Sequence, residues 1–127
     1  MFEILSVQTK EEQKNICELC GVAFDINCMA YAVRDNGRII GVSQFRILGG
    51  YAVVYHLANA RGIDDVAALT VLGKASLNFI DLCGIQDVIL KAVDQDLPHL
   101  LGFTQDELGV WRVNLEGYFK PCTERAE

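Results

Sequence analysis

Tyr51-Ala-Val-Val-Tyr-His-Leu57 is the stretch of this chain from which the fold can be worked out. It is apolar or aromatic at nearly every position and β-branched in the middle, which is typical of a strand buried on both faces in the centre of a sheet. A polar connection follows, and then a mainly apolar helical pattern over 65–83 that Gly84 is placed to end. A second apolar strand over 85–93 comes next. The sequence therefore predicts a strand, a helix and a parallel strand joined as one right-handed crossover unit.

The rest of the chain adds antiparallel strands and two shorter helices. Thr9, with Glu12 three residues later, forms a capping-box pattern that begins a helix, and Asn36-Gly37 supplies the positive φ angles of a tight hairpin turn. The elements expected in chain order are a strand over 1–8, a helix over 10–21, a three-stranded meander over 29–60, the crossover helix over 65–83, a strand over 85–93, a short helix over 97–102 and a strand over 110–119. We expect one α+β domain over 1–127, with a mixed, mostly antiparallel sheet and helices on both of its faces.

The composition restricts the class of protein. Hydrophobic residues make up 51% of the 127 residues, but no apolar run reaches the length needed to span a membrane and no secretory signal precedes the first strand. We therefore expect a cytoplasmic protein with a soluble core. The net charge of -6 argues against nucleic acid and anionic membrane surfaces as partners, since both require concentrated Lys and Arg. It suits a cationic small substrate, although solubility alone also explains it.

Five cysteines in such a chain are expected to be reduced thiols. Cys17 and Cys20 share one side of the first helix, whose apolar stripe is expected to contain Ile16, Leu19 and Cys20. A metal site would need a second cysteine pair or a nearby His, and this region has neither. Core packing is therefore favoured over a thiol-based or redox role, which stays open as an alternative, and no metal ligand is assigned.

The order of elements resembles the GNAT acetyltransferase fold. The best local matches are Arg61-Gly62 after the central strand, Gly84-Ile85 after the crossover helix, and Leu101-Gly102-Phe103 before the last strand. The resemblance covers most of the chain and implies an N-acyltransferase that uses acetyl-coenzyme A and a small amine. The segment between the first strand and the meander is shorter than usual in that family, which normally has two helices there.

In the GNAT family, the pantetheine arm of acyl-coenzyme A lies along the central strand and its pyrophosphate binds the loop that follows. By resemblance, the pantetheine would lie along Leu57, Ala58 and Asn59. The same resemblance implies a pyrophosphate loop that contains Asn59, Arg61, Gly62 and Ile63. Backbone N–H groups and the positive end of the helix dipole would hold the phosphates.

Two acidic residues, Asp64 and Asp65, stand where that family has small residues. A carboxylate in the first turn of a helix caps free N–H groups that a phosphate would otherwise use. It also repels a bound diphosphate by roughly 1–4 kcal/mol per pair near a surface. Helix capping is the favoured interpretation of this pair, and paired carboxylates for acid–base or metal chemistry are the alternative.

His56, on the central strand, is the candidate general base, because its imidazole titrates in the range that amine acylation needs. A His packed in the sheet with a satisfied hydrogen bond is the structural alternative. The position at which the family often carries a Tyr general acid is Pro98 here, and His99 is adjacent. Gln44 and Arg46 share a strand face and either reach a ligand or form a solvated edge.

These departures leave a second functional hypothesis beside the enzyme. The chain would then be a catalytically silent member of the fold that binds a small ligand or another protein. It would pair through its exposed sheet edge or its apolar helix, and a homodimer belongs to this hypothesis.

Overall fold

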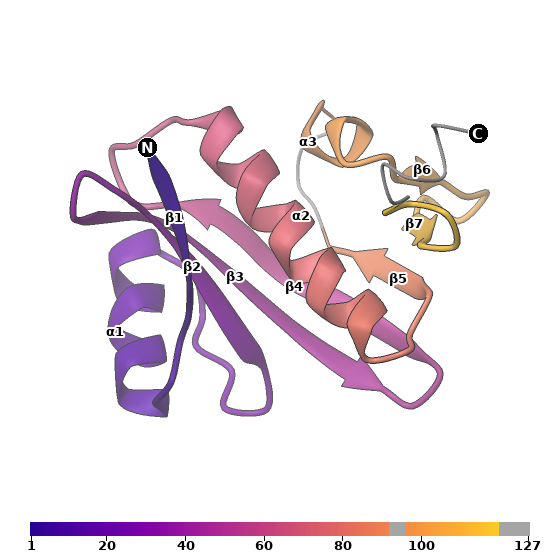
Figure 1. Cartoon of the computed structure of the whole chain (residues 1–127), viewed down its shortest axis with the longest axis horizontal. Helices are drawn as coiled ribbons and strands as arrows, with labels where there is room; N and C mark the ends of the chain where they lie inside the picture. The colour runs from indigo at the N-terminus through magenta and orange to yellow at the C-terminus, as the bar shows by residue number, and fades with distance from the viewer. Residues whose placement is uncertain (92–95, 120–127) are drawn as a thin grey trace, which may run out of the picture.

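The computed structural model describes residues 1–91 and 96–119, which form a seven-stranded sheet with three helices (Figure 1). The elements are β1 (Phe2–Ser6), α1 (Lys10–Cys20), β2 (Met29–Asp35), β3 (Arg38–Leu48), β4 (Tyr51–Asn59), α2 (Val66–Leu82), β5 (Asp87–Leu90), α3 (Asp96–Leu100), β6 (Thr104–Gln105) and β7 (Trp111–Asn114). The strand order is β1-β2-β3-β4-β5-β7-β6, and β4 with β5 is the parallel pair among antiparallel neighbours. The predicted α+β class with a mixed, mostly antiparallel sheet is confirmed.

Helices α1 and α2 pack on opposite faces of this sheet. On β3, the side chain of Gln44 contacts Gln13 of α1, whereas the neighbouring Ser43 hydroxyl contacts Ser76 of α2. Successive side chains on a strand point to opposite faces, so these two contacts place the helices on different sides. The prediction of helices on both faces is therefore correct.

The crossover unit forms as the sequence predicts. Helix α2 runs from an N-cap at Asp65 and crosses in front of the sheet in Figure 1. It is followed by Gly84 with a φ of 82°, a left-handed conformation that favours glycine. Leu72, Leu77 and Ile80 of α2 are fully buried against the sheet, and burial of each such side chain contributes about 1.5–3 kcal/mol before the cost of ordering the chain.

The N-terminal half also follows its sequence signals. The Thr9 hydroxyl accepts a hydrogen bond from the Glu12 N–H at 3.1 Å, so α1 begins where the capping pattern placed it. The hairpin between β2 and β3 turns at Asn36 and Gly37, with φ angles of 53° and 78°. The apolar stripe of α1 was only partly right, because Leu19 is 46% exposed and Gln13 is buried in its place.

The C-terminal strands differ from the prediction in extent. Strand β5 is shorter than the expected 85–93, of which residues 92 and 93 lie outside the described residues, and β7 is shorter than the expected 110–119. Strand β6 was missed, because two residues carry no alternation that a sequence pattern could reveal. No helix within residues 1–91 and 96–119 is both long and apolar enough to cross a membrane.

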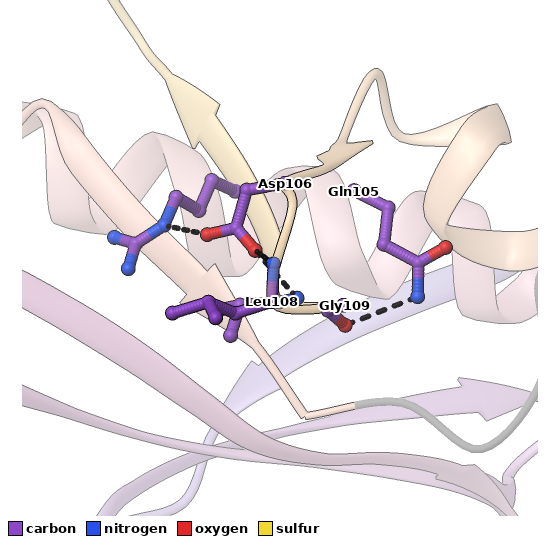
Figure 2. A network of polar contacts seen from close by, with 6 residues as sticks. Gln105, Asp106, Leu108 and Gly109 are labelled. Carbon is purple, nitrogen blue, oxygen red and sulfur yellow. Dashed lines mark hydrogen bonds and ion pairs between the residues drawn. The ribbon is translucent and has the colours of Figure 1, made fainter.

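A polar network closes the turn between β6 and β7 (Figure 2). The Asp106 carboxylate accepts hydrogen bonds from the Leu108 N–H at 2.9 Å and from Arg112 Nε at 2.8 Å. Gln105 Nε2 donates to the Gly109 carbonyl at 3.0 Å. The bond from Arg112, and then those from the backbone, hold the pKa of Asp106 below its ordinary value. These bonds hold the turn together although the two strands that it joins, β6 and β7, are short.

Candidate functional site

Strands β4 and β5 pair for only part of their length. The pairing ends at Val54 with Leu90, and the Lys91 N–H makes a last hydrogen bond to the Val54 carbonyl at 2.9 Å. Beyond Val54, no described residue pairs with β4 on the β5 side, although β4 continues through Asn59 against β3. A β-bulge lies at the same place, where Tyr55 is the extra residue of β4. Among the described residues, the central strand therefore has an unpaired backbone edge towards its carboxyl end.

The direction of the backbone identifies which groups lie on that unpaired edge. The Ala60 N–H donates to the Ile40 carbonyl of β3 at 2.8 Å. Because the backbone groups of an antiparallel strand alternate in direction, the N–H and C=O groups of Ala58 also point to β3. Those of Leu57 and Asn59 point away from β3, to the side on which β5 pairs with the earlier part of β4.

The loop between β4 and α2 is held by hydrogen bonds of its own. The Asn59 side chain accepts from the Asp65 N–H at 3.1 Å and donates to the Asp65 carbonyl at 3.3 Å, so it clasps the far end of the loop. The Ile63 N–H donates to the Ala60 carbonyl at 2.9 Å. Gly62 has a φ of 81°, which only glycine adopts without strain in this turn. These hydrogen bonds fix the conformation of the loop in the absence of a ligand.

Arg61 is turned towards α1. Its N–H donates to the Leu19 carbonyl at 3.0 Å. Its guanidinium lies against Gly21, where Nε is 3.1 Å from the position that a Cβ atom would occupy. The side chain therefore lies near the C-terminus of α1, where a cation is stabilised by the helix dipole.

Four backbone N–H groups around the start of α2 have no acceptor among the described residues. They belong to Gly62, Asp64, Val66 and Ala67. The N-terminus of α2 therefore retains donors that an anion could use.

Asp65 caps α2, as the sequence predicted. Its carboxylate accepts from the Ala68 N–H at 3.0 Å. Asp64 is exposed beside it, outside this bond. The Asp65 cap satisfies the Ala68 N–H and leaves the other four N–H groups at the start of α2 without an acceptor among the described residues. Both carboxylates add negative charge to the site.

His56 lies just after the bulge and is half-buried. Its Nδ1 atom is 2.9 Å from Nε2 of Gln44, which is fully buried. The orientation of the Gln44 amide is fixed by the backbone, because its oxygen accepts from the Asp25 N–H at 3.1 Å and its nitrogen donates to the Ala23 carbonyl at 2.7 Å. The remaining amide hydrogen of Gln44 therefore points at His56 Nδ1, which must be an unprotonated acceptor.

This contact defines the state of the imidazole. A neutral ring that accepts at Nδ1 carries its proton on Nε2. Burial lowers the pKa of His56, and the neighbouring Asp25 opposes that shift in part. The lone pair that a general base would use is thus engaged by Gln44 in this arrangement.

The network around Gln44 was not predicted from the sequence. Gln13 of α1 is also buried, and its Nε2 lies 2.8 Å from Gln44 Oε1. The interpretation of Gln44 as part of a solvated edge was wrong, because it is 0% exposed. A glutamine within a strand of otherwise apolar inward residues was the available signal, but its partners lie 12 to 31 residues away.

The side chain of Leu57, on the part of β4 beyond Val54, packs against α2 beside the end of α3. Leu101, which follows α3, and Leu57 of β4 both lie against Gly73 of α2. A Cβ atom on Gly73 would come within 2.8 Å of Leu101. The Tyr118 hydroxyl donates to the Leu101 carbonyl at 2.7 Å and holds the end of α3 in place. Pro98, which the resemblance places at the position of a Tyr general acid, is buried in α3.

The sequence also singled out His99 on α3 and two cysteines on α1. His99 is exposed on α3 and packs edge-on against Trp111, with ring centroids 5.1 Å apart. Cys17 and Cys20 are buried, and their predicted packing role in α1 is confirmed. Burial raises the pKa of Cys20 to about 11, so its thiol stays protonated at neutral pH.

Comparison with known proteins identifies the fold. No protein-family model matches the sequence, and no curated protein sequence is significantly similar to it. The structure is similar to a GNAT family acetyltransferase from Brucella melitensis in complex with acetyl-CoA, with a TM-score of 0.70 and 12% identity over 95% of this chain and 90% of that chain. It is also similar to the PaiA N-acetyltransferase from Thermoplasma acidophilum in complex with coenzyme A, with a TM-score of 0.66 and 11% identity over 88% and 96%.

A third similar structure is the ribosomal-protein-S18-alanine N-acetyltransferase from Escherichia coli, with a TM-score of 0.65 and 12% identity over 90% of each chain. At these identities the similarity establishes the fold. The chain has the fold of the GNAT acetyltransferases, and the resemblance drawn from the sequence is confirmed at that level.

Proposed function

We propose that the chain is an acyl-coenzyme A N-acyltransferase that transfers an acetyl group to a small amine. The observation that supports this most is the unpaired edge of β4 beyond Val54, next to the unpaired N–H groups at the start of α2. An extended pantetheine arm has amides that can pair with such an edge, and a diphosphate fits such a helix N-terminus. The site therefore offers both kinds of contact that an acyl-coenzyme A requires.

In this proposal, the backbone of Leu57, Ala58 and Asn59 lines the pantetheine arm. The N–H groups of Gly62, Asp64, Val66 and Ala67 bind the diphosphate. Arg61 and Ile63 belong to the loop but hold its shape, since the N–H groups of both donate within the protein. Acetyl-coenzyme A, when bound, supplies the activated thioester.

Asp64 and Asp65 weaken this binding without removing the site. Only the Ala68 donor is taken by the Asp65 cap, so the remaining cost is the repulsion between carboxylate and phosphate. At a surface this amounts to roughly 1–4 kcal/mol per pair before screening by salt. We therefore expect an affinity weaker than an uncharged loop would give.

A cationic acceptor amine must first lose a proton, because only the neutral nitrogen has a lone pair. This nitrogen then attacks the thioester carbon, the C–S bond breaks, and coenzyme A leaves as its thiolate, while a second proton is lost from the acylated nitrogen. His56 stays the candidate base, and it would act through Nε2. That role needs the proton to move to Nδ1, where it would oppose the Gln44 amide hydrogen. A small cationic amine suits the net charge of -6, and a cytoplasmic location stays a prediction.

The hydrogen bond from Gln44 to His56 favours a second candidate function. A catalytically silent protein would use the same site for binding alone, since Gln44 holds the base and Pro98 offers no proton. Self-association into a homodimer through the sheet edge stays a prediction of this second hypothesis.

Thermal unfolding in increasing acetyl-coenzyme A tests the proposal. A ligand that binds only the folded protein raises the melting temperature with concentration, by an amount equivalent to about 2.7 kcal/mol at 100 times Kd. Coenzyme A, which lacks the thioester, and pantetheine, which also lacks the nucleotide, serve as matched ligands. The absence of any shift at millimolar concentrations would remove the proposal.

Release of free thiol in the presence of a panel of small amines separates the two candidates. An enzyme releases coenzyme A faster with an amine present, and His56→Asn slows this release without weakening acetyl-coenzyme A binding. A protein that binds acetyl-coenzyme A but releases no thiol with any amine is the silent form.

A further inference from the structure

We propose that a groove beside α1 binds a basic, amphipathic helix of another protein. This groove, called here the α1 groove, has a volume of about 660 Å³. Its apolar floor consists of Leu5 from β1, Ile39 from β3, and Ile16 and Leu19 from α1. Because it lies on the opposite side of the sheet from α2, the inference does not rest on the acyl-transfer proposal.

The groove exists because α1 covers only part of its side of the sheet. The helix turns Gln13, Cys17 and Cys20 inward, and its main contacts are with β3. The flank of α1 that faces β1 and the hairpin borders the groove. Leu19 is 46% exposed there, so its side chain is available to a partner.

The spacing of the groove residues on α1 suits a helical partner. Glu12, Ile16 and Leu19 follow one another at spacings of four and three residues, so they form a single line along the flank of α1. A second helix lying beside α1 would place its own apolar residues at the same spacing between this line and the sheet. Helix-in-groove recognition uses such a stripe.

The charges of the rim select the partner. Glu11 and Glu12 are exposed at the groove, and neither forms an ion pair with a described residue. The one cation of the lining, Arg34, is already paired with Glu3 at 3.0 Å. In a chain of net charge -6, this rim attracts Lys and Arg and repels acidic helices. The partner is therefore a helix with an apolar stripe and basic flanks.

Two synthetic peptides of about 18 residues test this proposal, one an amphipathic Leu/Lys helix and the other its Leu/Glu counterpart. Each is labelled with a fluorophore, and its affinity for the full chain is measured by fluorescence anisotropy. We expect the Leu/Lys peptide to bind and the Leu/Glu peptide not to bind. Leu19→Asp should weaken the Leu/Lys peptide by at least about tenfold, and Glu11→Gln with Glu12→Gln should weaken it and reduce its salt dependence.

The matched control is Leu82→Asp, at an exposed position on the far end of α2, which should leave the affinity unchanged. Thermal unfolding of each variant confirms that it is folded. Equal binding to the wild type and to Leu19→Asp, or no binding by the wild type, would overturn the proposal. So would sedimentation showing a dimer of the wild type that Leu19→Asp dissociates, because the groove would then hold a second copy of this chain.

Discussion

The Gln44 side-chain amide donates a hydrogen bond to Nδ1 of His56, with 2.9 Å between the two nitrogen atoms. Backbone groups of Asp25 and Ala23 fix the orientation of that amide, so the amide cannot turn to offer its oxygen to the ring. Through these bonds, Gln44 of β3 links the segment after α1 to His56, which lies just after the bulge of β4. In this arrangement His56 is a structural acceptor, whereas the proposed function would use it as a base.

Stability should fall as the pH is lowered through the range in which His56 titrates. Burial lowers the pKa of His56 below its ordinary value of 6.5, with Asp25 opposing part of the shift. The unfolded chain therefore binds more protons than the folded chain below about pH 6.5, and the stabilising contribution, complete above that pH, is lost as the pH falls. Urea unfolding at about pH 7.5 and pH 5 measures the difference.

His56→Asn should reduce this dependence, because the Asn oxygen can accept from Gln44 without titrating. His99→Asn, at an exposed position, is the control and should leave the dependence as it is. If His56→Asn and the wild type lose the same free energy of unfolding between the two pH values, His56 is not the group responsible.

Gln44→Met should destabilise the protein by about 3 kcal/mol or more. The substitution keeps the length of the side chain but leaves the Asp25 N–H, the Ala23 carbonyl and His56 Nδ1 without the partner that Gln44 provides. Gln13 keeps the carbonyls of Asp25 and Cys28 as acceptors. Each unsatisfied buried group costs about 1–3 kcal/mol. Arg46→Met, on the same strand and only half-buried, is the control, and an equal small loss in both variants would contradict this account of the network.

Gly73→Ala should destabilise the protein, although Ala is the better helix former by about 1 kcal/mol. Its Cβ would lie 2.8 Å and 3.0 Å from the two methyl groups of Leu101 and 3.2 Å from Leu57. Overpacking of this kind costs about 1–3 kcal/mol. In a double-mutant cycle with Leu101→Ala, the combined loss should be smaller than the sum of the two single losses; a stabilising Gly73→Ala would show that the contact yields freely.

Asp65→Ala should cost about 1 kcal/mol through loss of the N-cap, while Asp65→Asn should cost little because Asn caps equally well. Comparison of these two variants separates the contribution of the cap from that of the charge. Combined Asp64→Asn and Asp65→Asn should tighten acetyl-coenzyme A by about tenfold at low salt, since the repulsion is removed and the cap is kept. Isothermal titration measures both affinities, and an unchanged affinity would show that charge at this loop does not oppose the ligand.

The features that the sequence predicted are local ones. The apolar 51–57 strand, the turn at Asn36 and Gly37, and the caps at Thr9 and Asp65 each depend on residues close together in the chain. Once these elements were placed, the rules for connecting strands left few arrangements for the sheet.

The features that were missed depend on partners far apart in the sequence. Nothing near Gln13 or Gln44 indicates that their amides meet across 31 residues, and a polar residue on a half-buried strand is ordinarily assigned to solvent. Leu19 was assigned to the core for the same reason, because hydrophobicity alone does not say which side of α1 faces the sheet. The end of the pairing between β4 and β5 after Val54, among the described residues, was implied by the resemblance to the GNAT fold and not by the residues of either strand.

Backbone amide chemical shifts during a titration with acetyl-coenzyme A test the central claim most directly. A ligand at the junction of β4 and α2 should shift the amide signals of Leu57, Asn59, Gly62 and Val66, and leave those of the α1 groove unchanged. Saturable shifts confined to the first set are the result that this account predicts. Shifts that avoid these amides, or none at millimolar ligand, would contradict it.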